Sequence, residues 1–465
     1  MAFIQSFGAA KVVTGSAHLL TLENGTKILI DCGMFQGQNE DKNSKKLEFN
    51  SADIDYVVFT HAHLDHVGRS PLLFKEGFRG QVVATRPTFE LARVVMLDSA
   101  HLMKEEYRQH FRKAQRRGEE NRVKPPLYSA EDVESFLTLK KRYASYGKTI
   151  KLQKDLTVTF YNAGHILGSA FVEVCYVEKG LQKRIVFSGD LGNENDVVLP
   201  APENPQEADT LYIESTYGDR IHKDIDASIE EFKNTVIQTL QKGGNVLIPS
   251  FAIERTQEIL CMLKFMHKNR ELPVCRIFLD SPMAIRATRV YNKYTQELSS
   301  LCQEFLEEDG SVFDFPNFEF VKTQEASRKI NDIKSGTIII AGSGMCNGGR
   351  ILHHFKHRLW NKLNAIIFVG FQAKGTLGRE IVEGAQWIHL YHEKIKIAAS
   401  IHTINGFSAH ADQSELIEWM DSFERLGNVY LIHGEEEKQI VFKETIKKEL
   451  DKKAHIVEMG EKIYV

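Results

Sequence analysis

The chain lacks the features that mark several common classes of protein. Its six cysteines lie far apart and none forms a CxxC pair, which argues against both a disulfide framework and a zinc site built from thiolates. It has no apolar run long enough to span a bilayer, and its first residues show no basic segment followed by an apolar block. We therefore expect a cytoplasmic protein with reduced thiols, in which nitrogen and oxygen ligands hold any metal.

The chain also lacks an excess of one charge. It has 59 basic and 62 acidic side chains and a net charge of −3, so no overall field attracts a polyanion and any contact with nucleic acid must be local. One basic stretch departs from this balance, HFRKAQRRGEENRVKPP at residues 110–126. We favour a solvated helix end followed by a loop at Pro125 and Pro126 over an RNA-gripping arm, although both interpretations can hold together.

Length and pattern predict an α/β protein with more than one domain. At 465 residues the chain exceeds the usual size of a single hydrophobic core, so two domains are the default expectation. Strand-length apolar runs such as TKILIDCG and KRIVFSGD recur through the first two hundred residues. Helical stretches then alternate with strands such as NVLIPSF and GTIIIAGSG, the spacing that a parallel sheet requires.

The segment THAHLDHVG, residues 60–68, concentrates metal ligands where a strand ends. His61 and His63 are two residues apart, and Asp65 and His66 follow them. A loop leaving a strand can direct all four side chains into one small volume, and zinc uses imidazole and carboxylate ligands at open sites. Four ligands exceed what one catalytic ion normally takes, so the pattern favours two metals. A polar loop with incidental histidines is the alternative, but buried imidazoles without partners would cost stability.

Other candidate ligands also follow strand-like runs. They are His165 in YNAGHILGS, Asp190 in IVFSGDLGN and His433 in YLIHGEE. Each is weak by itself, because a lone histidine is more often a hydrogen-bonded surface residue and a lone SGD is an ordinary turn. Together with HAHLDH they make seven candidate ligands.

These segments occur in the order of a known family. TKILIDCG, HAHLDH, AGHILGS, SGD and HGE resemble the successive motifs of the metallo-β-lactamase superfamily. IESTYG at 213–218, FSAHAD at 407–412 and the histidine of HGE resemble the additional motifs of the β-CASP nucleases. That branch includes the cleavage endonuclease of messenger-RNA 3′-end processing. The resemblance extends from GAAKVVTGSAH to HGE, which is nearly the whole chain.

The resemblance implies a fold and a division into domains. The expected fold is a four-layer αββα metallo-β-lactamase sandwich with an inserted β-CASP α/β domain, in which helices flank a parallel sheet. Residues 1–205 would form the first part of the metallo-β-lactamase domain, 206–394 the β-CASP domain and 395–465 the returning part.

The resemblance also assigns the ligands. One zinc ion would take His61, His63 and His165, the other Asp65, His66 and His433, with Asp190 and a hydroxide bridging both. The same ligands accept manganese or iron. Asp31 is similar to the family's carboxylate that orients a ligand histidine or the hydroxide without binding metal, although a turn former at a strand end is the alternative.

The implied reaction is hydrolysis. Two metals lower the pKa of a shared water and stabilise an in-line displacement, but the scaffold hosts phosphodiester, thioester, lactone and β-lactam chemistry alike. In the β-CASP pattern His410 pairs with Glu214 and acts as a general acid toward the leaving alkoxide, and Asp65 is counted with them as catalytic. A Glu214–His410 pair that only ties two domains together is the alternative.

Substrate contacts are expected in the inserted domain. AGSGMCNGGR at 341–350 resembles the family's SGM segment, and its backbone N–H groups with a guanidinium suit a phosphate, so we expect contacts from Ser343 and Arg350. Close packing of a Gly-rich turn at a sheet edge is the alternative. ERTQE resembles a segment that commonly reads GRTQE, which adds Arg255 to the expected contacts, although Glu254 stands where glycine is usual.

The leading hypothesis is a zinc-dependent ribonuclease that cleaves single-stranded RNA, internally or from the 5′ end. RNA is preferred over DNA because His433 is present, whereas the DNA-repair branch typically lacks a histidine at that motif. The alternatives are a metal-dependent hydrolase of a small ester, thioester or lactone, and a non-catalytic RNA-binding subunit. We expect no membrane association and allow for a homodimer.

Overall fold

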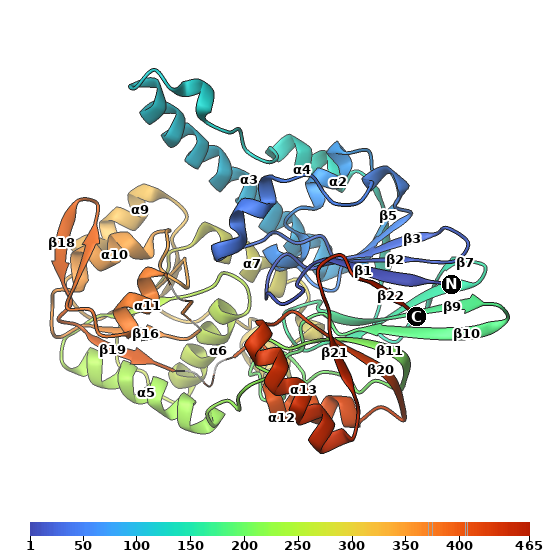
Figure 1. Ribbon diagram of the computed structural model, residues 1–465. Coiled ribbons are helices and arrows are strands. Elements are labelled where there is room, and N and C mark those ends of the chain that lie inside the picture. The colour runs from blue at the N-terminus through green and yellow to red at the C-terminus, as the bar shows by residue number, and fades with distance from the viewer. Residues whose placement is uncertain (371, 374, 405, 407) are drawn as a thin grey trace. The chain divides into compact units, whose positions relative to one another are not determined.

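The computed structural model describes residues 1–370, 372–373, 375–404, 406 and 408–465, and the chain forms two compact units (Figure 1). Unit 1 comprises Met1–Gly192, Ala201–Ile221 and His410–Val465, and unit 2 comprises Asn193–Pro200 and His222–Ala409. None of the helices in the described residues is long and apolar enough to cross a membrane.

Two seven-stranded sheets form the centre of unit 1. The first has the order β22 (Lys462–Tyr464), β1 (Phe3–Gly8), β2 (Ala17–Thr21), β3 (Lys27–Ile30), β4 (Tyr56–Val58), β5 (Gln81–Thr85) and β6 (Lys140–Ala144). The second has the order β21 (Ala454–Ile456), β20 (Arg425–Ile432), β11 (Glu207–Glu214), β10 (Leu181–Phe187), β9 (Ala170–Glu178), β8 (Leu156–Asn162) and β7 (Ile150–Gln153). Ile4 and Val58 of the first sheet share one hydrophobic core with Phe160 and Ile185 of the second, so the sheets pack face to face.

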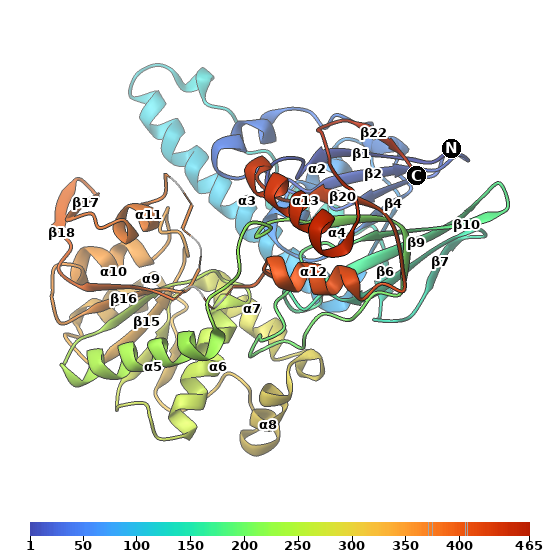
Figure 2. The same cartoon turned by 60° about the horizontal axis from the view of Figure 1, so that its bottom comes forward.

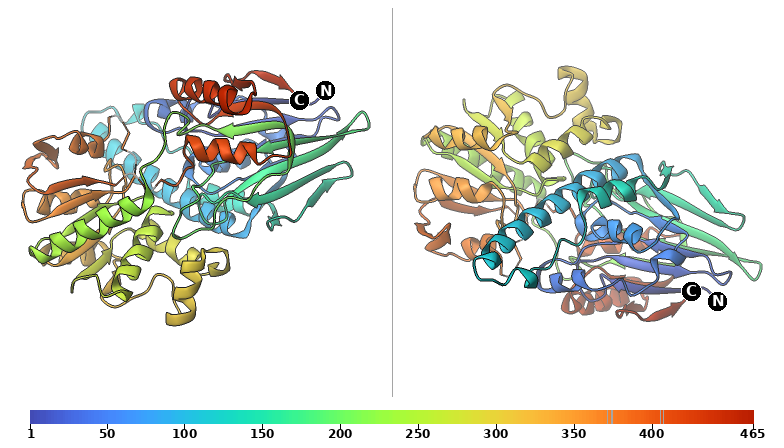
Figure 3. Two further views of the ribbon diagram at one scale, coloured as in Figure 1. Left: turned by 90° about the horizontal axis from the view of Figure 1, so that it is seen from below. Right: turned by 90° about the horizontal axis from the view of Figure 1, so that it is seen from above.

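Helices cover the outer faces of this sandwich. α12 (Gln413–Asp421) and α13 (Glu436–Leu450) lie against the second sheet, where Leu416 and Phe442 pack on Leu211 and Ile213 (Figure 2). On the side of the first sheet lie α1 (Leu64–Val67), α2 (Ser70–Lys75), α3 (Arg86–Gln115) and α4 (Ala130–Leu137) (Figure 3). Helix, sheet, sheet and helix follow one another, which confirms the predicted αββα sandwich.

Unit 2 is built on the predicted parallel sheet. Its order is β14 (Phe318–Phe320), β13 (Arg276–Leu279), β15 (Thr337–Ala341), β12 (Val246–Pro249), β16 (Ala365–Phe368) and β19 (Ser400–Thr403). Its helices include α5 (Ile225–Gln241), α6 (Arg255–Lys268), α7 (Pro282–Tyr291), α8 (Ser300–Asp309), α9 (Gln324–Lys329), α10 (Ile351–Arg358) and α11 (Leu377–Val382). Leu247 and Phe368 of the sheet share a core with Phe355 of α10 and with Ile388 of the hairpin β17 (Trp387–Leu390) and β18 (Glu393–Lys396).

The two units differ at their edges from the expected domain boundaries. β11 begins one residue after the expected boundary at 206, yet it pairs in parallel with β10 and β20 inside unit 1. β19 lies beyond residue 395, yet it pairs with β16 inside unit 2. The hydrogen-bonding partner of a strand decides its unit, and one sequence does not identify that partner.

Glu254 adopts a backbone conformation that favours glycine. It precedes α6 with a φ of 68°, in the left-handed region. Its side chain is buried, its Oε2 accepts a hydrogen bond of 2.5 Å from the Tyr291 hydroxyl, and its Oε1 has no hydrogen-bond partner among the described residues. Burial raises the pKa of Glu254 well above its usual value, and the nearby Asp196 carboxylate raises this pKa further.

We expect Glu254→Gln to weaken the dependence of stability on pH. Because the pKa of Glu254 is higher in the folded chain, the unfolded chain loses this proton first as pH rises. The free energy of unfolding therefore falls as the pH rises through the interval between the unfolded pKa of 4.5 and the higher folded pKa. Glutamine cannot ionise and retains the contact with Tyr291. The slope of the free energy of unfolding against pH should therefore become less steep in this interval, by the equivalent of up to about one bound proton. Urea denaturation between about pH 4 and 8 measures the slope.

The exposed residue Glu325 on α9 provides a matched control, because Glu325→Gln changes the same group at a solvated position. This variant should keep the wild-type slope. A wild-type slope in Glu254→Gln as well would contradict the expected role of the buried carboxyl.

Candidate metal centre

The carboxyl ends of parallel strands meet at one edge of unit 1. β10, β11 and β20 are parallel neighbours, and their ends bring Asp190, Glu214 and His433 to the same side of the second sheet. In the first sheet, β3 and β4 are also parallel. Asp31 follows β3 and the HAHLDH segment follows β4, so two sheets deliver polar side chains to one site.

A close approach of two loops holds the HAHLDH segment in place. The backbone N–H of Cys32 donates to the carbonyl oxygen of His66 at 2.7 Å. A Cβ added at Gly33 would lie 1.5 Å from the carbonyl oxygen of Asp65, so only glycine allows this approach.

The loop that carries His165 is fixed in a similar way. Ser169 Oγ accepts a hydrogen bond of 3.0 Å from the backbone N–H of His165. A Cβ added at Gly192 would lie 1.8 Å from the carbonyl oxygen of Gly164, so the chain that follows Asp190 passes directly over this loop.

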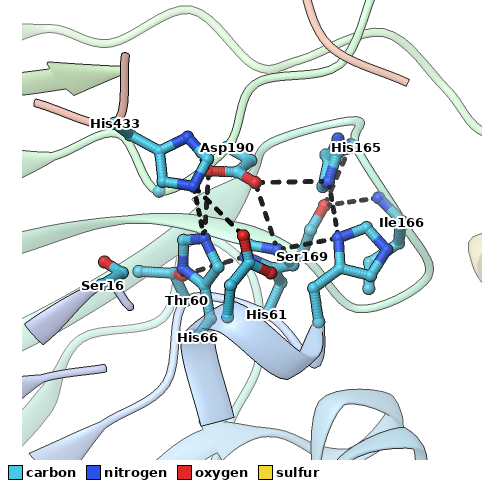
Figure 4. A network of polar contacts seen from close by, with 12 residues as sticks. Ser16, Thr60, His61, His66, His165, Ile166, Ser169, Asp190 and His433 are labelled. Atoms are coloured by element: carbon cyan, nitrogen blue, oxygen red, sulfur yellow. Dashed lines mark hydrogen bonds and ion pairs between the residues drawn. The ribbon is translucent and has the colours of Figure 1, made fainter. Parts of the chain in front are cut away.

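The first group of candidate ligands comprises His61, His63, His165 and Asp190. Nδ1 of His63 lies 3.2 Å from Nε2 of His61 and 3.1 Å from Nε2 of His165. Asp190 Oδ2 lies 3.4 Å from Nε2 of His61 and 3.6 Å from Nε2 of His165 (Figure 4). Tetrahedral zinc with bonds of about 2.0–2.1 Å separates its ligand atoms by about 3.3 Å, so this donor set fits an ion.

The second group comprises Asp65, His66 and His433. Nε2 of His433 lies 3.1 Å from Nε2 of His66 and 3.5 Å from Asp65 Oδ2. Asp190 Oδ1 faces this group, 3.3 Å from Nε2 of His66, and has no hydrogen-bond partner among the described residues. Asp190 therefore presents one oxygen to each group.

Burial and neighbouring charges set the protonation of the ligands. Burial lowers the pKa of His61 well below its usual value and that of His63 to about 4, so both imidazoles have the neutral form that binds metal. Burial opposes the charge on His66, but the Asp190 and Asp31 carboxylates raise the pKa of His66 well above its usual value. Burial likewise opposes ionisation of Asp190, but the imidazoles of His433, His66 and His61 hold its pKa well below the usual range.

Asp31 supports a ligand without joining either group. Its Oδ2 lies 2.8 Å from Nδ1 of His66, and its Oδ1 accepts a hydrogen bond of 2.9 Å from the backbone N–H of Thr60. This contact turns Nε2 of His66 toward the other ligands, as expected of a carboxylate behind a metal ligand.

Two threonines that the sequence analysis did not single out contact ligand rings. Thr60 Oγ1 lies 3.1 Å from Nδ1 of His61, and Thr216 Oγ1 lies 3.1 Å from Nδ1 of His433. Thr60 directly precedes HAHLDH and Thr216 lies within IESTYG, so adjacency to the motifs was the available signal.

Glu214 and His410 form a pair beside the two groups. Nδ1 of His410 lies 3.1 Å from each carboxylate oxygen of Glu214, and the centroids of the His410 and His165 rings are 4.5 Å apart. Burial lowers the pKa of His410, but Glu214 outweighs burial and raises it to about 9. The imidazole is therefore charged near pH 7. Phe407, the first residue of the FSAHAD motif, lies outside the described residues.

The expected substrate contacts Ser343 and Arg350 belong to unit 2. Arg350 Nη1 donates to Asp280 Oδ1 at 2.6 Å and to the carbonyl oxygen of Val321 at 3.0 Å. The Ser343 hydroxyl donates to the carbonyl oxygen of Gly348 at 3.4 Å. The Arg350 guanidinium already has a carboxylate partner, so its contact with a phosphate stays a prediction.

Arg255 is buried at the start of α6 in unit 2. Only 4% of the residue is exposed, and Nη1 pairs with the Glu258 carboxylate. Asp196 and Glu254 also act electrostatically on the guanidinium. This geometry gives no support to a direct contact between Arg255 and a substrate, and the expected contact stays a prediction.

Three family models match the chain. Residues 19–209 match the metallo-beta-lactamase superfamily domain, residues 256–381 the Beta-Casp domain, and residues 394–457 the Zn-dependent metallo-hydrolase RNA specificity domain. The first and third of these contain the ligands of both groups, so the fold and the donor set together define a metallo-hydrolase.

Curated relatives agree with these matches over most of the chain. Ribonuclease TTHA0252 of Thermus thermophilus is 43% identical over 94% of each chain. Transcription termination factor FttA of Methanocaldococcus jannaschii is 32% identical over 97% of this chain and 70% of its own length. FttA of Pyrococcus abyssi is 32% identical over 91% of this chain and 65% of its own length. The chain belongs to the β-CASP family of the metallo-β-lactamase superfamily, which confirms the resemblance found in its motifs.

Substituting Gly33 should separate the two loops that hold the centre. We expect Gly33→Ala to lower the free energy of unfolding by about 2 kcal/mol or more and to weaken metal retention, because the new methyl group overlaps the carbonyl of Asp65. Chemical denaturation and the metal content after dialysis measure the two effects. Gly348→Ala is the control, since a Cβ at Gly348 meets no atom within 4 Å. Equal stability and metal content in both variants would contradict the importance of the close approach.

Proposed function

We propose that this chain is a zinc-dependent ribonuclease of the cytoplasm that hydrolyses phosphodiester bonds in single-stranded RNA. One arrangement carries the proposal: two ligand groups share Asp190 and lie beside the pair of Glu214 and His410. The relative named Ribonuclease TTHA0252 supports RNA as the substrate, as does the match to a domain named for RNA specificity.

The two groups would hold two ions. His61, His63 and His165 would bind one zinc ion, Asp65, His66 and His433 the other, and Asp190 both. When bound, the pair would supply Lewis acidity and a hydrolytic nucleophile at neutral pH, and manganese or iron(II) can take the same ligands.

Glu214 and His410 handle the leaving group in this proposal. Cleavage of a phosphodiester expels an alkoxide, which requires a proton at the departing oxygen. Glu214 is fixed by the backbone N–H of Leu191, which donates to its Oε1 at 2.6 Å, and its carboxylate keeps His410 protonated. We assign His410 as the acid that donates this proton. Asp65 stays among the catalytic residues, because its side chain is 16% exposed and can meet a substrate at the second ligand group.

A cleavage assay tests the proposed function. Protein loaded with zinc or manganese should cleave labelled single-stranded RNA, and protein treated with a chelator should not. His63→Ala should lose cleavage and keep RNA binding, because it removes a ligand of the first group only. Hydrolysis of a small ester or lactone without cleavage of RNA would contradict the proposal, and so would RNA binding without cleavage by either metal form.

The choice of leaving group distinguishes a proton donor from a structural histidine. We expect His410→Gln to lower kcat on RNA by about 10²- to 10⁴-fold while the metal content is unchanged, because the leaving alkoxide then lacks its acid. Bis(p-nitrophenyl) phosphate releases a stable phenolate that needs no proton, so its hydrolysis should be nearly unchanged. Tyr217→Phe is the control, since the Tyr217 ring lies 6.0 Å from His410 and the substitution removes only a hydroxyl. Equal decreases on both substrates would contradict the assignment.

A further inference from the structure

The second half of α3 leaves the body of unit 1. α3 contains 30 residues, and its side chains as far as Ala100 pack into the unit, whereas no residue between 101 and 127 is buried. Figures 1 and 2 show this half of α3 extending away from the two sheets of unit 1. We define residues 101–127 as the arm. It comprises the end of α3, the short helix η3 (Glu120–Arg122) and the returning loop.

The base of α3 is bonded to the loop that carries a candidate ligand. The hydroxyls of Thr85 and Thr88 donate to the carbonyl oxygen of Gly168 at 2.8 Å and 2.7 Å. Gly168 lies three residues after His165 in the same loop. A helix of 30 residues is about 45 Å long, so α3 connects the metal centre to a point well outside it.

The arm carries a charge opposite to that of the whole chain. Residues 104–124 contain eight basic and four acidic side chains, whereas the net charge of the chain is −3. Two of the acidic residues pair with arginines of the arm itself, Glu105 with Arg108 and Glu119 with Arg122.

Four successive cations on the arm remain unneutralised. Arg112, Lys113, Arg116 and Arg117 are exposed and form no ion pair among the described residues. Arg112 and Lys113 lie in the last turn of α3, and Arg116 and Arg117 directly follow its last residue, Gln115. The C-terminus of α3 attracts nearby cations, and the exposed charged groups of these four side chains remain available to a polyanion.

Aromatic rings accompany these cations. Tyr107 and Phe111 lie one helical turn apart, are partly exposed, and have ring centroids 5.7 Å apart. Cations that follow a phosphate backbone, combined with rings on which bases stack, are how proteins hold single-stranded nucleic acid without sequence preference.

We propose that the arm binds the single-stranded RNA substrate at a distance from the metal centre, with Arg112, Lys113, Arg116 and Arg117 on its phosphates. This proposal rests on the proposed ribonuclease function and adds a second RNA-binding surface to it. Because α3 fixes the arm to the His165 loop, only an RNA long enough to reach from the centre to the arm benefits from this surface.

The test replaces all four cations by glutamine and compares two substrates. For an RNA of about 30 nucleotides we expect kcat/KM and affinity to fall about tenfold or more, while an RNA of about 6 nucleotides, too short to reach the arm, is cleaved at the wild-type rate. The plot of log affinity against log salt concentration has a negative slope, and its magnitude should become smaller by about 0.7 for every phosphate that the variant no longer neutralises.

A charge-matched control removes four lysines from other exposed positions of unit 1: Lys148, Lys151, Lys154 and Lys179. This variant should bind the long RNA like the wild type. Equal affinity of the arm variant and the wild type for the long RNA would overturn the proposal. The arm would then either bind a protein partner or only face solvent. An equally weakened lysine control would also overturn it, because the effect would then come from net charge.

Direct binding separates this inference from the proposed function. If no RNA is cleaved by any form of the protein, the ribonuclease proposal fails, but the affinity of labelled RNA for the wild type and the arm variant still tests the arm. Circular dichroism and thermal unfolding of both variants show whether each remains folded.

Discussion

The buried carboxylate of Asp190 is the constraint on which the centre depends. Only 2% of the residue is exposed, and an isolated charge at that depth would be strongly unfavourable. Imidazole nitrogens lie on two sides of this carboxylate, because Oδ2 faces His61 and His165 while Oδ1 faces His66. The parallel ends of β10 and β20 and the close approaches at Gly33 and Gly192 bring these side chains together. Metal held by the two ligand groups would offset this charge and bind the imidazole lone pairs.

A neighbouring carboxylate decides whether a buried histidine of the site is neutral or charged. Burial lowers the pKa of His63 to about 4, which suits a metal ligand, whereas the Glu214 carboxylate raises the pKa of His410 to about 9, which suits a proton donor. The two residues belong to one unit and differ in whether a carboxylate offsets the cost of burying their charge. The arm differs from this buried site, because its four successive cations are exposed to solvent and have no carboxylate partner among the described residues. Chemistry and substrate binding would then reside on different parts of unit 1.

Periodicity in the sequence predicted the parallel sheet, and the local cluster HAHLDH marked the candidate metal site. The αββα sandwich and the division of the ligands into two groups came from the resemblance of the motifs to a known family, and the structure brings these ligands together. Local pattern could not assign β11 and β19 to their units, since strand pairing joins residues far apart in the chain. It could not show that Arg350 has Asp280 as a partner, because 70 positions separate the two residues. Thr216 beside His433 escaped prediction for the same reason.

Anomalous scattering from crystals grown without added metal tests the central claim most directly. Data collected on both sides of the zinc absorption edge should show two peaks flanking Asp190, one among His61, His63 and His165 and one among Asp65, His66 and His433. An absence of peaks there, or a single peak bound to one group with the other group rearranged, would contradict a binuclear centre built on one shared carboxylate.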